Sequence, residues 1–329
     1  MQLVCINFKY FSKNTMEKIM KKIIYNQYGT NEVLELTDVT KPTPNMGELL
    51  IEVKSASINP IDWKLRNGDF KMMSGSKFPK GIGCDFAGII KDLGSNSSEF
   101  KIGDEVFGWI PYKEAGTFAE FVLSKEVLTV KKPKNISFQE ASCLGMIGGT
   151  ALIALEEKGK ITENQEILIN GCTGGVGHIA TQIAKKYGTK VTGICSGMNI
   201  ETAKKLDVYT VIDYKKQNAY SLNKKFDIIF DTVGNLEYKK AKIILKNKGK
   251  FLDLNPTGLL NILHGLLSSK YKVIMASVKK EHLIELAKLS KDEKIKPILG
   301  RESNLVEAIK AIGTLENGER ILGKTVIVN

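Results

Sequence analysis

The chain has 329 residues, a length typical of about two domains, and its 43% hydrophobic and 26% charged residues are ordinary for a globular protein. Its formal net charge of +12 comes from dispersed lysines, because Arg66, Arg301 and Arg320 are the only arginines. Proteins that read nucleic acids usually cluster basic residues and favour arginine, so we expect no nucleic-acid partner. No apolar run approaches the roughly 20 residues that cross a bilayer, so we expect no membrane span.

Residues 1–19, MQLVCINFKYFSKNTMEKI, differ in character from the chain that follows. They lack the basic start, long apolar core and small-residue cleavage site of a secretory signal peptide. We expect a disordered N-terminal extension here, and a short amphipathic anchor is the alternative. The five cysteines are widely spaced and include no C-x-x-C pair, which indicates a reducing compartment and a cytoplasmic location.

Residues 20–136 consist of short β-branched or aromatic runs separated by turn signals such as KPTPNMGE and FKIGDE. This spacing predicts a small β-barrel or β-sandwich. The runs that we expect to be strands are 21–29, 48–58, 86–94, 104–110, 117–124 and 127–132.

The pattern changes at residue 137. Ser137, with Glu140 three residues later, is the signature of a capping box and predicts a helix over 137–157. Apolar strands then alternate with helical stretches, which predicts βαβ units and a parallel sheet covered on both faces. The tail, 292–329, is β-rich and is expected to return to the first domain. The expected strands are 166–170, 190–195, 208–214, 226–234, 249–255 and 271–278, and the expected helices include 176–187 and 237–247.

A glycine-rich loop, INGCTGGVGHIA, lies between the strand 166–170 and the helix 176–187. The N-terminus of a helix presents unpaired N–H groups and positive potential, and glycines allow a pyrophosphate to approach it closely. Gly174 and Gly177 fit the second and third glycines of a dinucleotide-binding G-x-G-x-x-G motif. Cys172 takes the first position, where we interpret it as a small buried residue. The residues predicted to hold the pyrophosphate are Thr173, Gly174, Gly175, Val176 and Gly177.

The strand that follows this helix ends at Cys195, in the sequence CSGMN. A site that prefers NAD places Asp or Glu there to bind the ribose 2′-hydroxyl, and this segment has neither. Cys195, Ser196 and Asn199 are therefore predicted to face the 2′-phosphate of NADPH. No arginine is present to bind that phosphate, so NADH stays open as the alternative cofactor. Asn199 has a second interpretation as the N-cap of the next helix.

The chain contains, in this order, the segments SINPIDWKLRNG, GCDFAG, FKIGDEVFG, TFAEF, GGTALIAL, TGGVGHIATQIAKK, VIDY and KPILGR. Together they resemble the zinc-independent quinone oxidoreductase and enone reductase branch of the medium-chain dehydrogenase/reductase superfamily. This resemblance implies a GroES-like substrate domain over 20–136 and 292–329 and a Rossmann domain over 137–291. It also implies NADPH, an active cleft between the domains, and relatives that are often dimers, so a homodimer is one expected partner.

The same resemblance implies roles for further residues. Ser196 corresponds to the position near the 2′-phosphate, and Tyr214 to a tyrosine near the adenosine ribose. Leu254 and Asn255 follow the strand that ends near the nicotinamide. Asn59 stands where the zinc-dependent branch has its first metal-binding cysteine.

A catalytic zinc ion needs cysteine, histidine or carboxylate ligands and an open position. This chain has Cys84 and Asp85 where zinc-dependent relatives have ligands, but Asn59 is a poor zinc ligand. We therefore expect no metal site, with Cys84 packed in the interior and Asp85 structural or lining the cleft.

Without a metal, the reaction that a nicotinamide cofactor supports is hydride transfer to an activated acceptor, a quinone or an α,β-unsaturated carbonyl compound. Asn59, Lys64 and Tyr112 are the predicted polarising groups, and Asn59 has the alternative role of ordering the turn before Pro60. Two other functions stay open. One is a cofactor-binding protein with a structural, nucleic-acid-associated or membrane-associated role, and the other is a zinc alcohol dehydrogenase.

Overall fold

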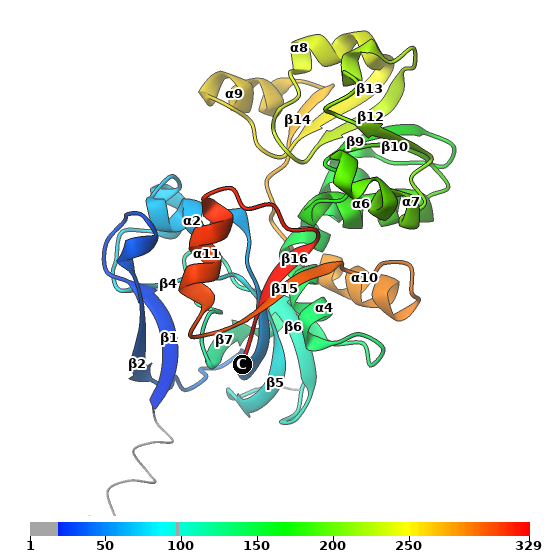
Figure 1. Ribbon diagram of the computed structural model, residues 1–329. Helices are drawn as coiled ribbons and strands as arrows, with labels where there is room; N and C mark the ends of the chain where they lie inside the picture. The colour runs from blue at the N-terminus through cyan, green and yellow to red at the C-terminus, as the bar shows by residue number, and fades with distance from the viewer. Residues whose placement is uncertain (1–18, 97–98) are drawn as a thin grey trace, which may run out of the picture.

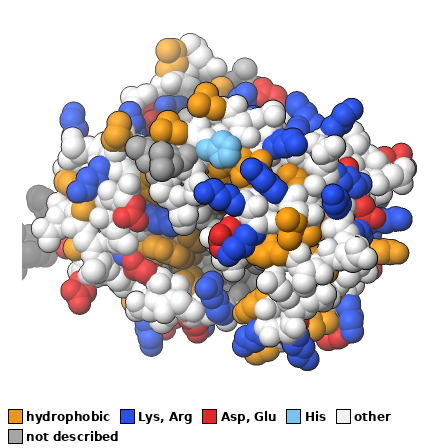
Figure 2. Space-filling model, turned by 90° about the horizontal axis from the view of Figure 1, so that it is seen from above, with side chains coloured by type: hydrophobic (Ala, Val, Ile, Leu, Met, Phe, Trp, Pro, Cys, Tyr) orange, Lys and Arg blue, Asp and Glu red, His pale blue; other side chains and the backbone are white. Residues whose placement is uncertain are grey.

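The computed structural model describes residues 19–96 and 99–329, which form a β-rich lobe and an α/β lobe joined along one side (Figure 1). The expected N-terminal extension, 1–19, falls almost wholly outside the described residues, and Ile19 is already the first residue of strand β1. Lysines are interspersed with acidic and hydrophobic side chains on the face seen in Figure 2.

The β-rich lobe is built on a seven-stranded sheet with the order β15-β16-β3-β5-β6-β8, in which β7 also pairs with β3. A smaller sheet, β2-β1-β4, lies beside it. The C-terminal strand β16 pairs antiparallel with β3, so the end of the tail lies in the sheet of the β-rich lobe. The strands are β1 (Ile19–Tyr25), β2 (Leu34–Thr40), β3 (Glu48–Ser57), β4 (Lys80–Gly81), β5 (Asp85–Leu93), β6 (Glu105–Trp109), β7 (Phe121–Lys125), β8 (Thr129–Lys131), β15 (Leu299–Asn304) and β16 (Lys324–Val328).

The α/β lobe contains a six-stranded, fully parallel sheet in the order β11-β10-β9-β12-β13-β14. Its strands are mostly buried on both faces, as predicted from their continuous apolar character. The predicted doubly wound parallel sheet is therefore confirmed. The strands are β9 (Glu166–Asn170), β10 (Lys190–Cys195), β11 (Thr210–Asp213), β12 (Phe226–Asp231), β13 (Leu245–Asp253) and β14 (Tyr271–Val273).

Helices cover both sheets and join the lobes. Helix α4 packs on β3 and β5, and α10 packs on β8, so both ends of the predicted Rossmann segment contact the β-rich lobe. The domain boundaries at 137 and 291 themselves stay a prediction. The helices are α2 (Pro60–Asn67), α3 (Lys71–Ser74), α4 (Phe138–Cys143), α5 (Gly149–Leu152), α6 (Gly175–Lys186), α7 (Ile200–Lys205), α8 (Tyr238–Ala241), α9 (Leu259–Leu267), α10 (Lys280–Lys291) and α11 (Ala308–Glu316).

The segment after residue 137 is one helical run, Phe138–Gly159, that contains two π-helical stretches, Leu144–Gly148 and Ile153–Gly159. The predicted capping box is confirmed, because Glu140 N donates to Ser137 Oγ (3.1 Å) and Ser137 N donates to Glu140 Oε2 (2.8 Å). By length and composition the run could cross a membrane, although the apolar pattern of the sequence predicted no membrane span. Most of it is buried inside the protein, as in a core helix.

The helix expected over 237–247 is much shorter in the structure. Helix α8 ends at Ala241, a 3₁₀ turn follows, and β13 already begins at Leu245. Ile244 and Leu245 are buried in the core of the parallel sheet, so tertiary packing overrides the helical pattern of this lysine-rich segment.

Candidate functional site

The glycine loop has the geometry of a dinucleotide-binding turn between β9 and α6. Gly171 has a φ of +78°, and Gly174 is the N-cap of α6. A Cβ atom on Gly177 would lie 1.9 Å from the carbonyl oxygen of Gly171, so a residue with a side chain cannot occupy this position without moving the loop. Helix α6 begins at this turn, and the N-terminus of a helix generally presents unpaired backbone N–H groups that suit a pyrophosphate.

A buried histidine fastens this loop to the C-terminal part of the chain. His178 Nδ1 donates to Gly174 O (2.8 Å), and Ile298 N donates to His178 Nε2 (3.0 Å). Burial lowers the pKa of His178 to about 4, so the ring is neutral at physiological pH. A neutral, buried side chain therefore fixes the position of the glycine loop.

Cys172 has no exposed surface, which agrees with its interpretation as a small buried residue. Its sulfur lies 2.6 Å from where a Cβ atom on Gly193 would be, so Gly193 leaves the space that the thiol fills. A hydrogen bond between the thiols raises the pKa of Cys172 and lowers that of Cys195. Cys195 itself is 4% exposed and its carbonyl accepts from Tyr214 N (3.2 Å), so its contact with a cofactor stays a prediction.

The predicted adenosine end contains an acid that sequence reasoning missed. Strands β10 and β11 pair in parallel with Cys195 opposite Asp213. A Cβ atom on Gly197 would be 2.7 Å from Asp213 Oδ2, so this carboxylate lies beside the CSGMN segment. Asp213 belongs to the VIDY segment and directly precedes Tyr214. Only the register between β10 and β11 shows that it lies beside the CSGMN segment.

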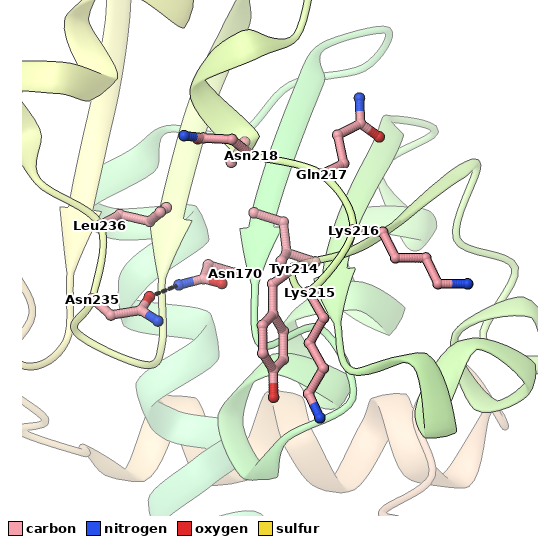
Figure 3. A pocket seen from close by; sticks show the side chains of 10 residues that line it. Asn170, Tyr214, Lys215, Lys216, Gln217, Asn218, Asn235 and Leu236 are labelled. Atoms are coloured by element: carbon pink, nitrogen blue, oxygen red, sulfur yellow. Dashed lines mark hydrogen bonds between the residues drawn. The ribbon is translucent and has the colours of Figure 1, made fainter.

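A cavity of about 330 Å³ opens at this end of the sheet (Figure 3). Tyr214, which is 57% exposed, and Lys215 extend in the same direction, whereas Lys216 points away from them. Asn199 Nδ2 donates to Thr173 Oγ1 (3.4 Å) and so connects the loop to this region. The residues lining the cavity are Asn170, Ile194, Tyr214, Lys215, Lys216, Gln217, Asn218, Ala219, Asn235 and Leu236.

The opposite end of the site joins two predicted residues that are 191 positions apart. Lys64 Nζ, from α2 in the β-rich lobe, donates to Asn255 Oδ1 (3.2 Å), just beyond β13 in the α/β lobe. Asn255 is also held by its own lobe, because its Nδ2 donates to Thr232 O (3.3 Å). Leu254 precedes Asn255 and packs against the core. The structure therefore brings a cationic side chain to the strand end where the nicotinamide was expected.

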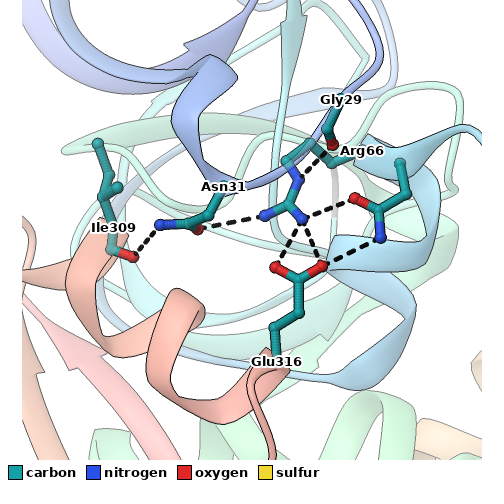
Figure 4. A network of polar contacts seen from close by, with 6 residues as sticks. Gly29, Asn31, Arg66, Ile309 and Glu316 are labelled. Carbon is teal, nitrogen blue, oxygen red and sulfur yellow. Dashed lines mark hydrogen bonds and ion pairs between the residues drawn. The ribbon is translucent and has the colours of Figure 1, made fainter.

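Helix α2 is held in place by a fully buried arginine (Figure 4). Arg66 forms an ion pair with Glu316 of α11, in which Nη2 lies 2.6 and 2.7 Å from Oε1 and Oε2. It also donates to Gly29 O (3.1 Å) and to Asn31 Oδ1 (3.2 Å). A planar guanidinium suits this set of acceptors, and the result is a rigid support for Lys64.

Asn59 lies directly before α2 and is 2% exposed. Its Nδ2 donates to Asp85 Oδ2 (2.9 Å) and to Ser57 O (3.2 Å), and its Oδ1 accepts from Lys324 Nζ (2.7 Å). Both amide hydrogens are thus in use within the protein. Donation by Asn59 to a substrate oxygen stays a prediction, whereas its role in ordering the turn is visible in the structure: Asn59 N donates to Asp62 Oδ2 (2.7 Å).

Burial perturbs the acids of this cluster. It raises the pKa of Asp62 from 3.8 to about 8 and that of Asp85 to about 6, against the opposing effect of the Lys324 ammonium. Tyr112 follows β6, and its ring meets Trp109 edge-on, with centroids 6.0 Å apart. Burial is the largest cause of the raised pKa of Tyr112, so its hydroxyl stays protonated at neutral pH.

The residues around Asn59 fit a zinc ion poorly. Cys84 and Asp85 are completely buried, and the ammonium group of Lys324 lies within hydrogen-bonding distance of Asn59, where it would repel a metal cation. Across residues 19–96 and 99–329, no three His, Cys, Asp or Glu side chains are grouped so that they could hold a metal ion.

Comparisons with known proteins agree with this architecture. Residues 45–134 match the alcohol dehydrogenase GroES-like domain, and residues 206–327 match the zinc-binding dehydrogenase family. A chloroplastic quinone-oxidoreductase homolog of Spinacia oleracea is 32% identical over 94% of this chain and 98% of its own. The chloroplastic NADPH-dependent alkenal/one oxidoreductase of Arabidopsis thaliana is 34% identical over 73% of this chain and 64% of its own. The structure of a quinone oxidoreductase from Coxiella burnetii has a TM-score of 0.87 at 31% identity, over 95% of this chain and 100% of that one.

Proposed function

Since the chain belongs to the quinone oxidoreductase branch of the medium-chain dehydrogenase/reductase superfamily, we propose that it transfers a hydride from NADPH to a quinone or to an α,β-unsaturated carbonyl compound, without zinc. The observation that carries the proposal is the pair of Lys64 and Asn255 (3.2 Å) at one end of a site whose other end is the glycine loop. An oxidoreductase with a nicotinamide cofactor needs both ends: one to hold the pyrophosphate and one to polarise the acceptor.

The loop fits the cofactor on geometric grounds. Gly177 leaves the space beside Gly171 that a side chain would fill, and the helix N-terminus supplies donors for the pyrophosphate. Thr173, Gly174, Gly175 and Val176 complete the proposed cradle.

Preference for NADPH rests on charge at the adenosine end. Lys215 lies beside Tyr214 in the cavity and supplies the cation that a 2′-phosphate needs. Asp213 opposes this preference because an acid in this place suits a ribose 2′-hydroxyl. Asp213 Oδ1, however, already accepts a hydrogen bond from Lys215 N (3.0 Å), so one of its two oxygens is less available to a ribose hydroxyl. Ser196 and Asn199 add neutral polar groups.

The acceptor is proposed from the donors available. When bound, the reduced nicotinamide supplies a hydride from C4. Lys64 places a positive charge near the strand end, and Tyr112 keeps a proton that it can donate. One well-placed donor stabilises a developing oxyanion by about 3–4 kcal/mol. That suits a conjugated acceptor, whose charge is delocalised, better than a simple ketone. Asn59 is the third proposed polarising group, and to act it would have to exchange its hydrogen bond to Ser57 O or Asp85 Oδ2 for one to the acceptor.

The test is oxidation of NADPH and of NADH by a quinone, an enone and a saturated ketone, each with and without a chelator. We expect turnover of the quinone or the enone with NADPH, little turnover of the ketone, and no effect of the chelator. Faster turnover with NADH would contradict the cofactor preference. Loss of turnover on chelation, with zinc bound to the protein, would favour an alcohol dehydrogenase, and NADPH binding without any turnover would favour a non-enzymatic role. The homodimer and the cytoplasmic location stay predictions.

A further inference from the structure

Lys324 is a basic residue in the interior of the protein, where burial lowers the pKa of its ammonium group and nearby acidic groups oppose that effect. It begins strand β16 and is 5% exposed. Its Nζ donates to Ile58 O (2.5 Å) and to Asn59 Oδ1 (2.7 Å). A buried ammonium is costly unless it is paired and hydrogen-bonded, so a lysine kept here needs a reason beyond packing.

The ammonium determines how the Asn59 carboxamide is oriented. Lys324 offers only donors, so Asn59 must turn Oδ1 toward it and Nδ2 toward Asp85 Oδ2 (2.9 Å). Asp85 is itself fixed, because Ser57 Oγ and Met146 N each donate to it at 2.7 Å. The carboxamide is therefore clamped between a cation and an anion directly before the first turn of α2.

The same lysine also lies beside the glycine loop. Its Cδ atom lies 3.5 Å from where a Cβ atom on Gly175 would be. Its backbone N donates to Ile298 O (2.8 Å), and Ile298 N in turn donates to His178, which holds Gly174 O. Lys324 therefore lies beside the glycine loop, is linked to it through Ile298 and His178, and contacts the residues before α2 through its Nζ.

We propose that Lys324 is a positioning residue that holds Asn59 and the start of α2, and with them Lys64, in register with the nucleotide loop. This inference rests on the proposed function, in which Lys64 acts on the acceptor. Removing the charge frees Asn59 to rotate and leaves the Asp85 carboxylate without its cation. The first turn of α2 then loses its fixed position, while the backbone of the nucleotide loop keeps its own contacts.

The first experiment separates the charge from the stem. Lys324→Met keeps most of the aliphatic chain and removes the ammonium, and Lys310→Met is the matched control on the exposed face of α11. We expect kcat of Lys324→Met with an enone to fall by about tenfold or more, the equivalent of a hydrogen bond to a charged group. We expect the dissociation constant of NADPH to change by less than about threefold, because the loop keeps its backbone donors. Lys310→Met should match the wild type.

The second experiment restores the missing atoms. Lys324→Ala lacks three carbons and the ammonium, which together have the size of n-propylammonium. Adding n-propylammonium should raise both kcat and the melting temperature of this variant, and 1-propanol of the same size should do so far less. If the variant does not fold alone, the yield of folded protein on refolding with each additive gives the same comparison.

Wild-type kcat in Lys324→Met would overturn the proposal, as would equal rescue by propanol, because the cavity and not the charge would then matter. The melting temperature is independent of turnover. If the wild type reduced no acceptor, the proposed function would fail, and selective rescue of stability by the ammonium would still support the positional role of Lys324.

Discussion

Asp62 offers a direct test of the buried cluster through the pH dependence of stability. Its side chain is completely buried; Oδ2 accepts from Asn59 N (2.7 Å), and Oδ1 has no hydrogen-bond partner within the described residues. Burial is the largest cause of its raised pKa, and Asp85 adds to it, whereas the bond from Asn59 N and the Lys324 charge oppose it. The folded protein therefore favours the neutral acid.

The sign and size of the effect follow from linkage. Folding raises the pKa of Asp62 from 3.8 to about 8, so the folded state binds the proton more tightly than the unfolded state. The stabilisation from the neutral acid is present in full below pH 3.8 and is lost as the pH rises to about 8. At roughly 1.4 kcal/mol for each pH unit, the loss amounts to about 6 kcal/mol of unfolding free energy.

Asp62→Asn replaces the acid by an amide of the same shape that cannot ionise. Urea unfolding of the variant and the wild type between pH 5 and pH 9 measures the difference. We expect the variant to gain on the wild type as the pH rises, by several kcal/mol in total. Asp69→Asn, at an exposed position after α2, is the control and should change the unfolding free energy equally at all pH values. Parallel curves for Asp62→Asn and the wild type would refute the reasoning.

Three further substitutions test the proposed site. Gly177→Val should abolish NADPH binding in a fluorescence titration and leave the far-UV circular dichroism unchanged, because its side chain would displace the Gly171 carbonyl. Gly175→Ala is the control and should weaken binding far less, because its Cβ atom would meet nothing nearer than 3.5 Å. Lys215→Glu should weaken NADPH binding by about tenfold to a hundredfold and NADH binding little, because a charge-assisted bond to the 2′-phosphate is lost. Lys216 points away from Tyr214 and Lys215, so an equal effect of Lys216→Glu would contradict this prediction. Lys64→Met should lower kcat with an enone by about a hundredfold at unchanged NADPH affinity, and a wild-type kcat would remove Lys64 from the mechanism.

The sequence alone predicted the features that depend on local spacing. The glycine loop could be placed because the strand, the turn and the helix N-terminus are adjacent in the chain, and the structure has them at β9, Gly174 and α6. The capping box at Ser137 is equally local, since both partners lie within four residues. The apolar runs predicted the fold class in the same way, because strands that are buried on both faces of a parallel sheet have continuous apolar sequences.

Only the tertiary structure decided which distant residues share the site. Asp213 lies beside the CSGMN segment because β10 and β11 pair in parallel at that register. Lys64 binds Asn255 because the two lobes are in contact there. The use of both Asn59 amide hydrogens depends on Asp85, and the orientation of its carboxamide depends on Lys324, 265 residues further on. Spacing along the chain determines which groups a single turn presents. The partner of a buried polar group depends on how distant elements pack together, and the sequence pattern does not show that arrangement.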